Sequence, residues 1–331
     1  MSFHSVLFHI ALLCSLFVAP VTAMQSLHEV IHSRPEFSTL STFMALLPDY
    51  ELSKLLHQSG PYTFFLPRNE GFRDVELMNY LTRLLTPTYR MHLFSLISYQ
   101  ITDRDVGEYA QQSLQNFLAG TDNISVEMET LVTDSVSVSS ANGVSITLSS
   151  PLTSVSQITG TAIETSDDAH AYEASEILQP QWMKWDFMSV MENFDWTEVS
   201  DFYSGPIYTK FIHLLVAAGK DEELRSAKGL TLLAPGNEAL SDYAMNIFLD
   251  PQYFEALTQF VEYHMIPQIL NIQDLEHASE NFITKQGEWI EVVSTDKGLK
   301  FNDSTLKGMH LCKHGVVYRL EMALLPPSWN V

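Results

Sequence analysis

Three residues near the start of the chain have the spacing of a zinc hydrolase site. His28, Glu29 and His32 form the pattern His-Glu-x-x-His. On a helix, two histidines four positions apart share one face and bind zinc, while the glutamate activates a water molecule. The chain offers no third ligand motif after them, and Pro35 ends any such helix at once. A zinc-dependent hydrolase is therefore the alternative function, and the favoured interpretation is a first helix that buries Leu27 and the apolar residues after it.

A second group of zinc-binding residue types lies near the end of the chain. His310, Cys312 and His314 alternate with other residues, so a strand would place all three side chains on one face. Three ligands on one strand rarely converge to a tetrahedral site. We therefore expect an exposed strand edge that leads into a turn, with these three residues as a secondary metal candidate.

Other catalytic signatures are missing from the sequence. It contains no Gly-x-Ser-x-Gly, P-loop, Gly-x-Gly-x-x-Gly or Cys-x-x-Cys motif. The acidic residues are dispersed in a way that is typical of solvated loops rather than calcium sites. The sequence thus favours a protein that is not an enzyme and that has no cofactor.

The composition limits the size and the partners of the molecule. The chain has 331 residues, of which 46% are hydrophobic, and its formal charge is −22. This length predicts two domains with real cores. The negative field argues against nucleic acid, heparin-like polymers and anionic membranes, and leaves proteins, neutral sugars and cations. The charge divides evenly between the two halves, so neither half is expected to have a basic face.

Residues 1–23 resemble a secretory signal peptide. An apolar stretch runs from Val6 to Val18 and is followed by small residues that end at Ala23. The stretch is shorter than a membrane span requires, so we predict a secreted, extracellular protein without one. Cys14 would leave with this segment. Cys312 then has no partner within the chain, so its thiol is either buried or bonded to another chain.

A block of ten residues occurs twice. Residues 63–72 return at 231–240 with the same threonine, proline, asparagine and glutamate. A short apolar strand that ends at proline, an asparagine that caps the next helix, and a glutamate in its first turn account for the pattern. The matched residues are Thr63, Pro67, Asn69 and Glu70 in the first copy and Thr231, Pro235, Asn237 and Glu238 in the second.

Helical and strand patterns surround each block in the same order. Stretches with apolar spacings of three and four, at 43–56 and 211–219, predict amphipathic helices with one buried face. Alternating stretches at 132–138, 144–148, 289–293 and 316–320 predict strands. The sequence therefore predicts an α+β protein with domains at 24–183 and 184–328 and a tail at 329–331. The first copy is 22 residues longer between its two matched prolines, and we place this insertion around 111–160.

Taken together, these blocks resemble the fasciclin-type domain in two tandem copies. The family pattern also has a helical Tyr-His pair before an apolar-Pro step, and a closing Asn-Gly-Val-Ile-His block. The second copy matches with Tyr263-His264 and with Gly315 to Tyr318, whereas the first copy has Ser98-Tyr99, if Ile101 corresponds to Ile266, and 168–172. The resemblance implies a β-wedge or sandwich flanked by a helical bundle, in which the matched positions are mainly structural.

The resemblance also implies a function. Members of the family are mostly extracellular adhesion and matrix proteins, and some, such as periostin-like proteins, bind integrins or collagen. The family's aspartate-hydrophobic pair falls here on Met309-His310 and Ile163-Glu164, which contain no aspartate, and Arg-Gly-Asp is absent. The expected partner is therefore an extracellular or cell-surface protein, with an integrin disfavoured.

Three further features carry expectations. His264 lies on the apolar stripe of a predicted helix, so we expect a hydrogen-bonded core histidine rather than a functional imidazole. Trp182, Trp185 and Trp196 fall in one stretch, for which we expect packing between the two domains. Asn123 and Asn302 begin glycosylation sequons in a chain that we expect to be secreted.

Overall fold

The computed structural model describes most of the chain after the predicted signal peptide. The described residues are 25–56, 62–86, 89–102, 106, 124–130, 135–141, 145–150, 156–166, 169–193, 207–271, 275, 279–295 and 298–329. The signal peptide with Cys14, Asn123 and Trp196 lie outside these ranges.

The chain folds into two domains with the same strand order. Each domain contains a seven-stranded sheet, ordered β2-β1-β7-β6-β5-β4-β3 in the first and β9-β8-β14-β13-β12-β11-β10 in the second. In both sheets one central pair is parallel, β1 with β7 and β8 with β14, and the other neighbouring strands are antiparallel. The first sheet comprises β1 (Tyr62–Pro67), β2 (Ile101–Thr102), β3 (Ile124–Glu129), β4 (Ser135–Ala141), β5 (Ser145–Ser149), β6 (Ser156–Glu164) and β7 (Ala169–Ala174). The second comprises β8 (Leu230–Pro235), β9 (Met265–Ile266), β10 (Ser279–Ile283), β11 (Trp289–Thr295), β12 (Gly298–Phe301), β13 (Ser304–Cys312) and β14 (Gly315–Leu320).

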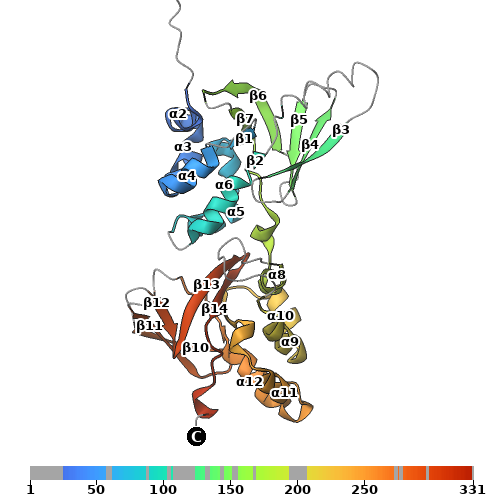
Figure 1. Ribbon diagram of the computed structural model, residues 1–331, viewed down its shortest axis with the longest axis vertical. Coiled ribbons are helices and arrows are strands. Elements are labelled where there is room, and N and C mark those ends of the chain that lie inside the picture. The colour runs from blue at the N-terminus through green and yellow to red at the C-terminus, as the bar shows by residue number, and fades with distance from the viewer. Residues whose placement is uncertain are drawn as a thin grey trace, which may run out of the picture.

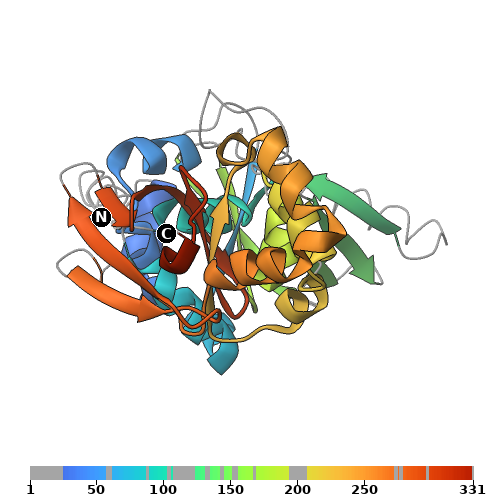
Figure 2. The same ribbon diagram turned by 90° about the horizontal axis from the view of Figure 1, so that it is seen from below.

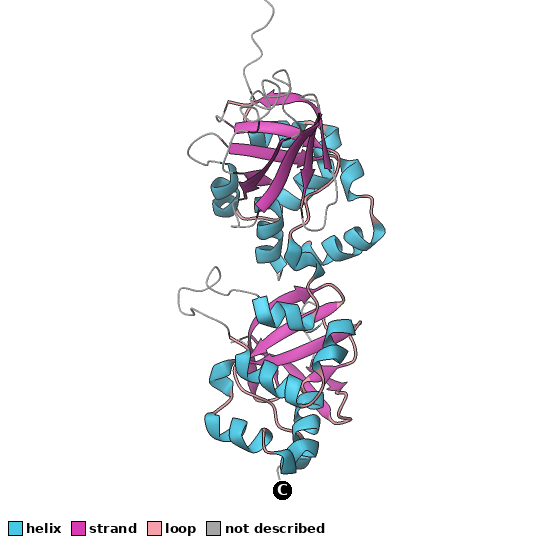
Figure 3. Cartoon of the chain, turned by 90° about the vertical axis from the view of Figure 1, so that its right-hand side faces the viewer, coloured by secondary structure: helices cyan, strands magenta, loops and turns pink. Residues whose placement is uncertain are grey.

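Short helices cover one side of each sheet, and the two domains are stacked end to end (Figures 1 and 3). Viewed along the long axis, the second domain lies in front of the first (Figure 2). The first domain has α2 (Leu27–Ser33), η1 (Pro35–Phe37), α3 (Ser38–Met44), α4 (Asp49–Leu56), η2 (Asn69–Phe72), α5 (Val75–Leu84) and α6 (Arg90–Ser98). After the short η4 (Gln181–Lys184), the second has α8 (Phe187–Asn193), α9 (Thr209–Ala217), α10 (Asp221–Ser226), η6 (Asn237–Ala239), α11 (Asp242–Phe248), η7 (Pro251–Tyr253), α12 (Phe254–Tyr263) and η8 (Pro327–Trp329). The predicted α+β architecture of two tandem copies is confirmed.

The predicted helices are shorter than their patterns suggest. The stretch 43–56 is interrupted before α4 because Pro48 has no backbone N–H with which to continue a helix. Leu46 therefore lies in a turn with 43% of its surface exposed, and Val216 on α9 is 51% exposed. Both residues belong to the stretches 43–56 and 211–219, whose apolar spacing predicted one buried face. For these two residues that expectation was wrong.

The repeated asparagine caps a helix, although not the one that follows it. Asn69 makes no cap to η2, and its Oδ1 instead accepts a hydrogen bond from the backbone of Thr39 at 3.0 Å, at the start of α3. Asn237 does the same for Lys210 at 2.9 Å, at the start of α9. Because each asparagine serves an earlier helix, the motif joins the end of a central strand to the N-terminus of a helix about thirty residues before it.

Each domain has an ion pair between its repeated block and the strand parallel to it, although the partner in the block stands at a different position in the two copies. Register places Glu173 opposite Leu66, and Arg319 opposite Ala234. Glu173 pairs with Arg68 at 3.1 Å, whereas Arg319 pairs with Glu238 at 2.5 Å. The two domains thus keep the pairing between the parallel strand and the repeated motif while the sign of each partner differs.

His264 is a fully buried polar side chain that joins three segments of the second domain by hydrogen bonds. Its Nδ1 donates to the carbonyl oxygen of Phe260 at 2.8 Å, and its Nε2 accepts from the backbone N–H of Leu324 at 3.1 Å. Its own carbonyl oxygen accepts from Leu233 on β8. The side chain has no exposed surface, and burial lowers its pKa to about 4. His264 is therefore a hydrogen-bonded core histidine, as its position on the apolar stripe predicted.

Gln100 makes the same link in the first domain. Its side chain donates to Leu96, four residues earlier, and exchanges hydrogen bonds with the backbone of Leu178. Register pairs Thr63 with Thr102 and Thr231 with Ile266. The position of Tyr263-His264 is thus occupied by Tyr99-Gln100, so the expectation of Ser98-Tyr99 was displaced by one residue.

We predict that His264→Ala destabilises the protein by about 2–4 kcal/mol, because it opens a cavity and leaves the N–H of Leu324 without its acceptor. His264→Gln should recover at least half of this loss, since Gln100 satisfies the equivalent groups in the first domain. Urea unfolding of the two variants beside the wild type measures both effects. Equal destabilisation by alanine and glutamine would contradict the equivalence.

Candidate interaction site at the domain junction

The His-Glu-x-x-His residues lie on a short exposed helix. Ser26 and Glu29 form a capping box at its N-terminus, in which each side chain accepts a hydrogen bond from the other's backbone. His28 and His32 stack with ring centroids 4.0 Å apart, and the Nδ1 of His32 lies 3.0 Å from the carbonyl oxygen of His28. The carboxylate of Glu29 is therefore occupied in capping the N-terminus of its own helix. Across the described ranges, no group of three or more His, Cys, Asp or Glu residues gathers where it could hold a metal ion.

His310, Cys312 and His314 do not form an exposed strand edge. β13 lies inside the sheet between β12 and β14, and its C-terminal part packs against α8 and η4. His310 and Cys312 are consequently buried, and burial raises the pKa of the thiol well above its usual value. His314 lies in the turn after the strand and is half-buried. The exposed edge was a wrong expectation because the sequence did not show what covers this strand.

The sequon at Asn302 is part of a hydrogen-bond network. Asn302 has a positive φ of 49°, its Oδ1 accepts from the backbone of Glu291, and its Nδ2 donates to the hydroxyl of Tyr263 at 2.9 Å. The hydroxyl of Ser304 exchanges hydrogen bonds with the backbone of Met322. The sequon side chains thus tie the turn between β12 and β13 to β11, to α12 and to the segment after β14, so a glycan on Asn302 would have to share an amide group that the fold already uses.

Three of the residues at the family's aspartate-hydrophobic positions are buried or partly buried. Met309 and Ile163 are partly buried against a hydrophobic core, and His310 is 1% exposed.

Aromatic side chains fill the junction between the domains. Trp182 on η4 lies 5.4 Å from the ring of His92 and 6.2 Å from that of Tyr80, both in the first domain. Trp185 packs against the core of the second domain, and its carbonyl oxygen accepts from the N–H of Lys313. The predicted packing between the domains is confirmed for Trp182, whose short helix also contacts β13, whereas the contacts of Trp185 lie within the second domain.

Two buried histidines face each other across this junction. The rings of His92 on α6 and His310 on β13 are 6.1 Å apart, and the Nε2 of His92 accepts from the N–H of Leu311 at 3.3 Å. Burial lowers the pKa of His92 to about 4, and it lowers that of His310 well below its usual value, with His92 adding to the effect. Both imidazoles are therefore neutral while the two domains are packed against each other.

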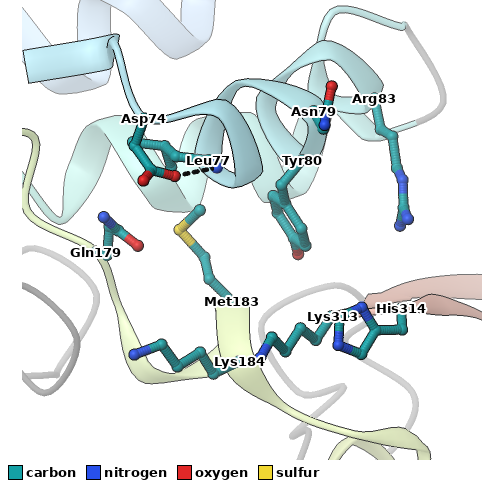
Figure 4. Close-up of a pocket in the computed structure, with 10 residues that line it drawn as sticks. All are labelled: Asp74, Leu77, Asn79, Tyr80, Arg83, Gln179, Met183, Lys184, Lys313 and His314. Carbon is teal, nitrogen blue, oxygen red and sulfur yellow. Dashed lines mark hydrogen bonds between the residues drawn. The ribbon is translucent and has the colours of Figure 1, made fainter. Parts of the chain in front are cut away.

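A pocket of about 450 Å³ opens beside these aromatic residues (Figure 4). Its walls come from α5, from η4 and from the turn between β13 and β14, so both domains contribute. The lining residues are Asp74, Leu77, Asn79, Tyr80, Arg83, Gln179, Met183, Lys184, Lys313 and His314.

The charge in this pocket is opposite to that of the whole chain. Arg83, Lys184 and Lys313 line it, with Asp74 as the one carboxylate among the lining residues, although the chain has only 18 basic side chains against 40 acidic ones. Within the described ranges, neither lysine ammonium forms an ion pair. The sequence did not predict this gathering, because the three cations come from separate segments and no local run of charge reveals them.

Tyr80 forms the floor of the pocket. It is 7% exposed, and among the described residues its hydroxyl oxygen has no hydrogen-bond partner. Burial raises the pKa of this phenol well above its usual value, so the group is a neutral donor. Figure 4 shows the hydroxyl pointing from α5 towards Lys313 and His314. The guanidinium of Arg83 lies 5.8 Å from the centre of the same ring.

The family model described as "Fasciclin domain" matches residues 38–169 and 206–326. Among solved structures, a FAS1 domain pair from the insect cell adhesion molecule fasciclin I aligns at 12% identity, over 89% of this chain and 99% of that chain, with a TM-score of 0.39. No curated protein matches.

We predict that acid destabilises the junction. The pKa of His92 is about 4 in the folded protein and near 6.5 in the unfolded chain, so between these values the unfolded chain binds a proton that the folded protein does not. This group costs the folded protein no stability above pH 6.5. As the pH falls from 6.5 towards 4, the free energy of unfolding decreases by up to about 3 kcal/mol. Unfolding midpoints in urea across this range should fall more steeply for the wild type than for His92→Gln, which carries no titrating ring. Parallel curves for the two proteins would contradict the assignment.

Proposed function

Because the chain belongs to the Fasciclin domain family, we propose that it is a secreted adhesion or interaction protein that binds matrix or cell-surface proteins and catalyses no reaction. Fasciclin domains are found in cell adhesion proteins. The observation that carries the proposal is the duplication itself, in which both copies match the family and share one strand order. Two such domains joined by a packed junction offer a partner a surface larger than either domain has alone.

Secretion is supported by the sequence. Residues 1–23 have the apolar stretch and the small residues before a cleavage site that a signal peptide needs. No helix in the described part of the chain has the length and the apolar character needed to cross a membrane. From the resemblance of residues 1–23 to a signal peptide we propose that the mature protein lies outside the cell, with domains at 24–183 and 184–328.

The absence of catalysis is supported by what the candidate residues do instead. Glu29 takes part in a capping box, and His310 and Cys312 are buried at the junction. In the described part of the chain these residues thus serve the fold. The zinc hydrolase that the motif at His28 suggests is therefore the less favoured function.

We predict that cells with a secretory pathway release this protein into the medium with Met24 as its first residue. N-terminal sequencing and mass measurement of the purified protein test this, with a variant that lacks residues 2–23 as the control that should stay inside the cell. The purified protein should contain no stoichiometric zinc by elemental analysis. Zinc at one equivalent that is lost on His28→Ala would favour the hydrolase instead.

The adhesion function itself needs a binding measurement. Immobilised wild-type protein should retain defined extracellular matrix proteins or cells, and the same protein unfolded by heat should not. If cells and matrix proteins of several tissues all fail to bind the folded protein, the proposal is wrong.

A further inference from the structure

We propose that the pocket at the domain junction binds a carboxylate-bearing segment of a protein partner. The inference rests on the proposed interaction function and assigns to it a surface and a partner chemistry. Three observations carry it: cations without ion pairs, a buried phenol without a partner, and walls that belong to both domains.

The cations are the first observation. Lys184 and Lys313 in the second domain hold exposed ammonium groups, and Arg83 on α5 of the first domain lines the same pocket (Figure 4). Acidic side chains outnumber basic ones by more than two to one, yet in the described ranges no acid forms an ion pair with these three. Asp74 is occupied, since its Oδ1 accepts from the N–H of Leu77 at 2.7 Å to cap α5. The Nη1 of Arg83 donates to the carbonyl oxygens of Cys312 and Gly315 at 3.4 and 3.3 Å, so the two lysine ammonium groups are the cations that remain available for an anion from outside.

The phenol is the second observation. A buried donor without an acceptor costs free energy in the free protein, and this cost is recovered when an oxygen of a ligand accepts the bond. The hydroxyl of Tyr80 is such a donor at the floor of the pocket. A carboxylate suits the site because it brings two acceptor oxygens and one negative charge, and bonds to charged acceptors are the stronger ones.

The negative net charge of the protein favours a short acidic segment over a long polyanion as the ligand of this pocket. The chain carries a net charge of −22, so a sulfated polysaccharide that extends beyond the pocket meets repulsion along its length. A single carboxylate, or a pair, fits within about 450 Å³ and remains among the cations. An acidic peptide is therefore the occupant that the charges favour.

The test uses fluorescently labelled pentaglutamate as the probe, with pentaglutamine as the uncharged control. Pentaglutamate should bind the purified protein with an affinity that falls as salt rises, and pentaglutamine should not bind. The double variant Lys184→Ala/Lys313→Ala should weaken binding by at least about tenfold, because it removes two charges from the pocket.

The matched control is Lys300→Ala/Lys307→Ala. It changes the net charge by the same amount, but its residues lie on β12 and β13, with Lys307 about 20 Å along the strand from the turn at Lys313. Binding by this variant should remain within about twofold of the wild type. Equal losses in the two double variants would show that the probe senses only the overall charge, and would overturn the proposal.

Tyr80→Phe separates a ligand-binding role from a structural one. The substitution removes a buried hydroxyl that has no partner, so the melting temperature should be unchanged or higher. Binding of pentaglutamate should nevertheless weaken by about three- to tenfold. Unchanged binding by Tyr80→Phe, or stronger binding of a heparin fragment than of pentaglutamate, would also overturn the proposal.

An adhesion measurement distinguishes a failure of the pocket proposal from a failure of the proposed adhesion function. Wild type and Lys184→Ala/Lys313→Ala are compared for adhesion to the same matrix protein. Adhesion of the wild type that the variant loses supports the pocket as the binding surface. Adhesion that both retain equally leaves the proposed function standing and overturns the pocket, whereas no adhesion by the wild type overturns the proposed function itself.

Discussion

A single buried polar side chain organises each domain. It lies at the end of a helix and bonds to the carbonyl oxygen four residues earlier, to the N–H of a leucine in the closing segment, and, through its own carbonyl oxygen, to a central strand. His264 makes these bonds in one domain and Gln100 in the other. Backbone groups that are hidden from water must be paired, and this side chain pairs those at which helix, sheet and closing segment meet.

The exchange of histidine for glutamine shows what the fold requires at this place. Both side chains place one donor and one acceptor on opposite sides of a flat group, and both can be buried without charge. The ion pairs of Glu173 and Arg319 are less strictly matched, since their partners Arg68 and Glu238 stand at different positions of the repeated block. At His264 and Gln100 the bonded backbone groups are the same in the two domains while the residue type differs. Duplicated domains can therefore share their architecture although little of their sequence remains alike.

The junction between the domains has neutral groups in its buried part and charged groups in the pocket beside it. His92 and His310 meet among aromatic rings, where burial keeps them uncharged. The cations of the pocket lie beside them, where solvent can still reach the lysines. This division places a fixed basic pocket on an otherwise acidic molecule. A site built from two domains exists only while both are packed together, so binding there and the stability of the junction are linked.

The sequence alone determined the features that depend on local patterns. The repeated block, the alternation of the strands and the apolar stripe around His264 predicted two α+β copies and a core histidine, because periodicity and turn chemistry act within a few residues. Asn69 and Asn237 cap helices about thirty residues earlier, and the equivalence of Gln100 with His264 emerged from strand register. The burial of His310 and the gathering of Arg83, Lys184 and Lys313 depended on how two domains pack. Only the tertiary structure decided these, because contacts between distant segments leave no period or spacing in the chain.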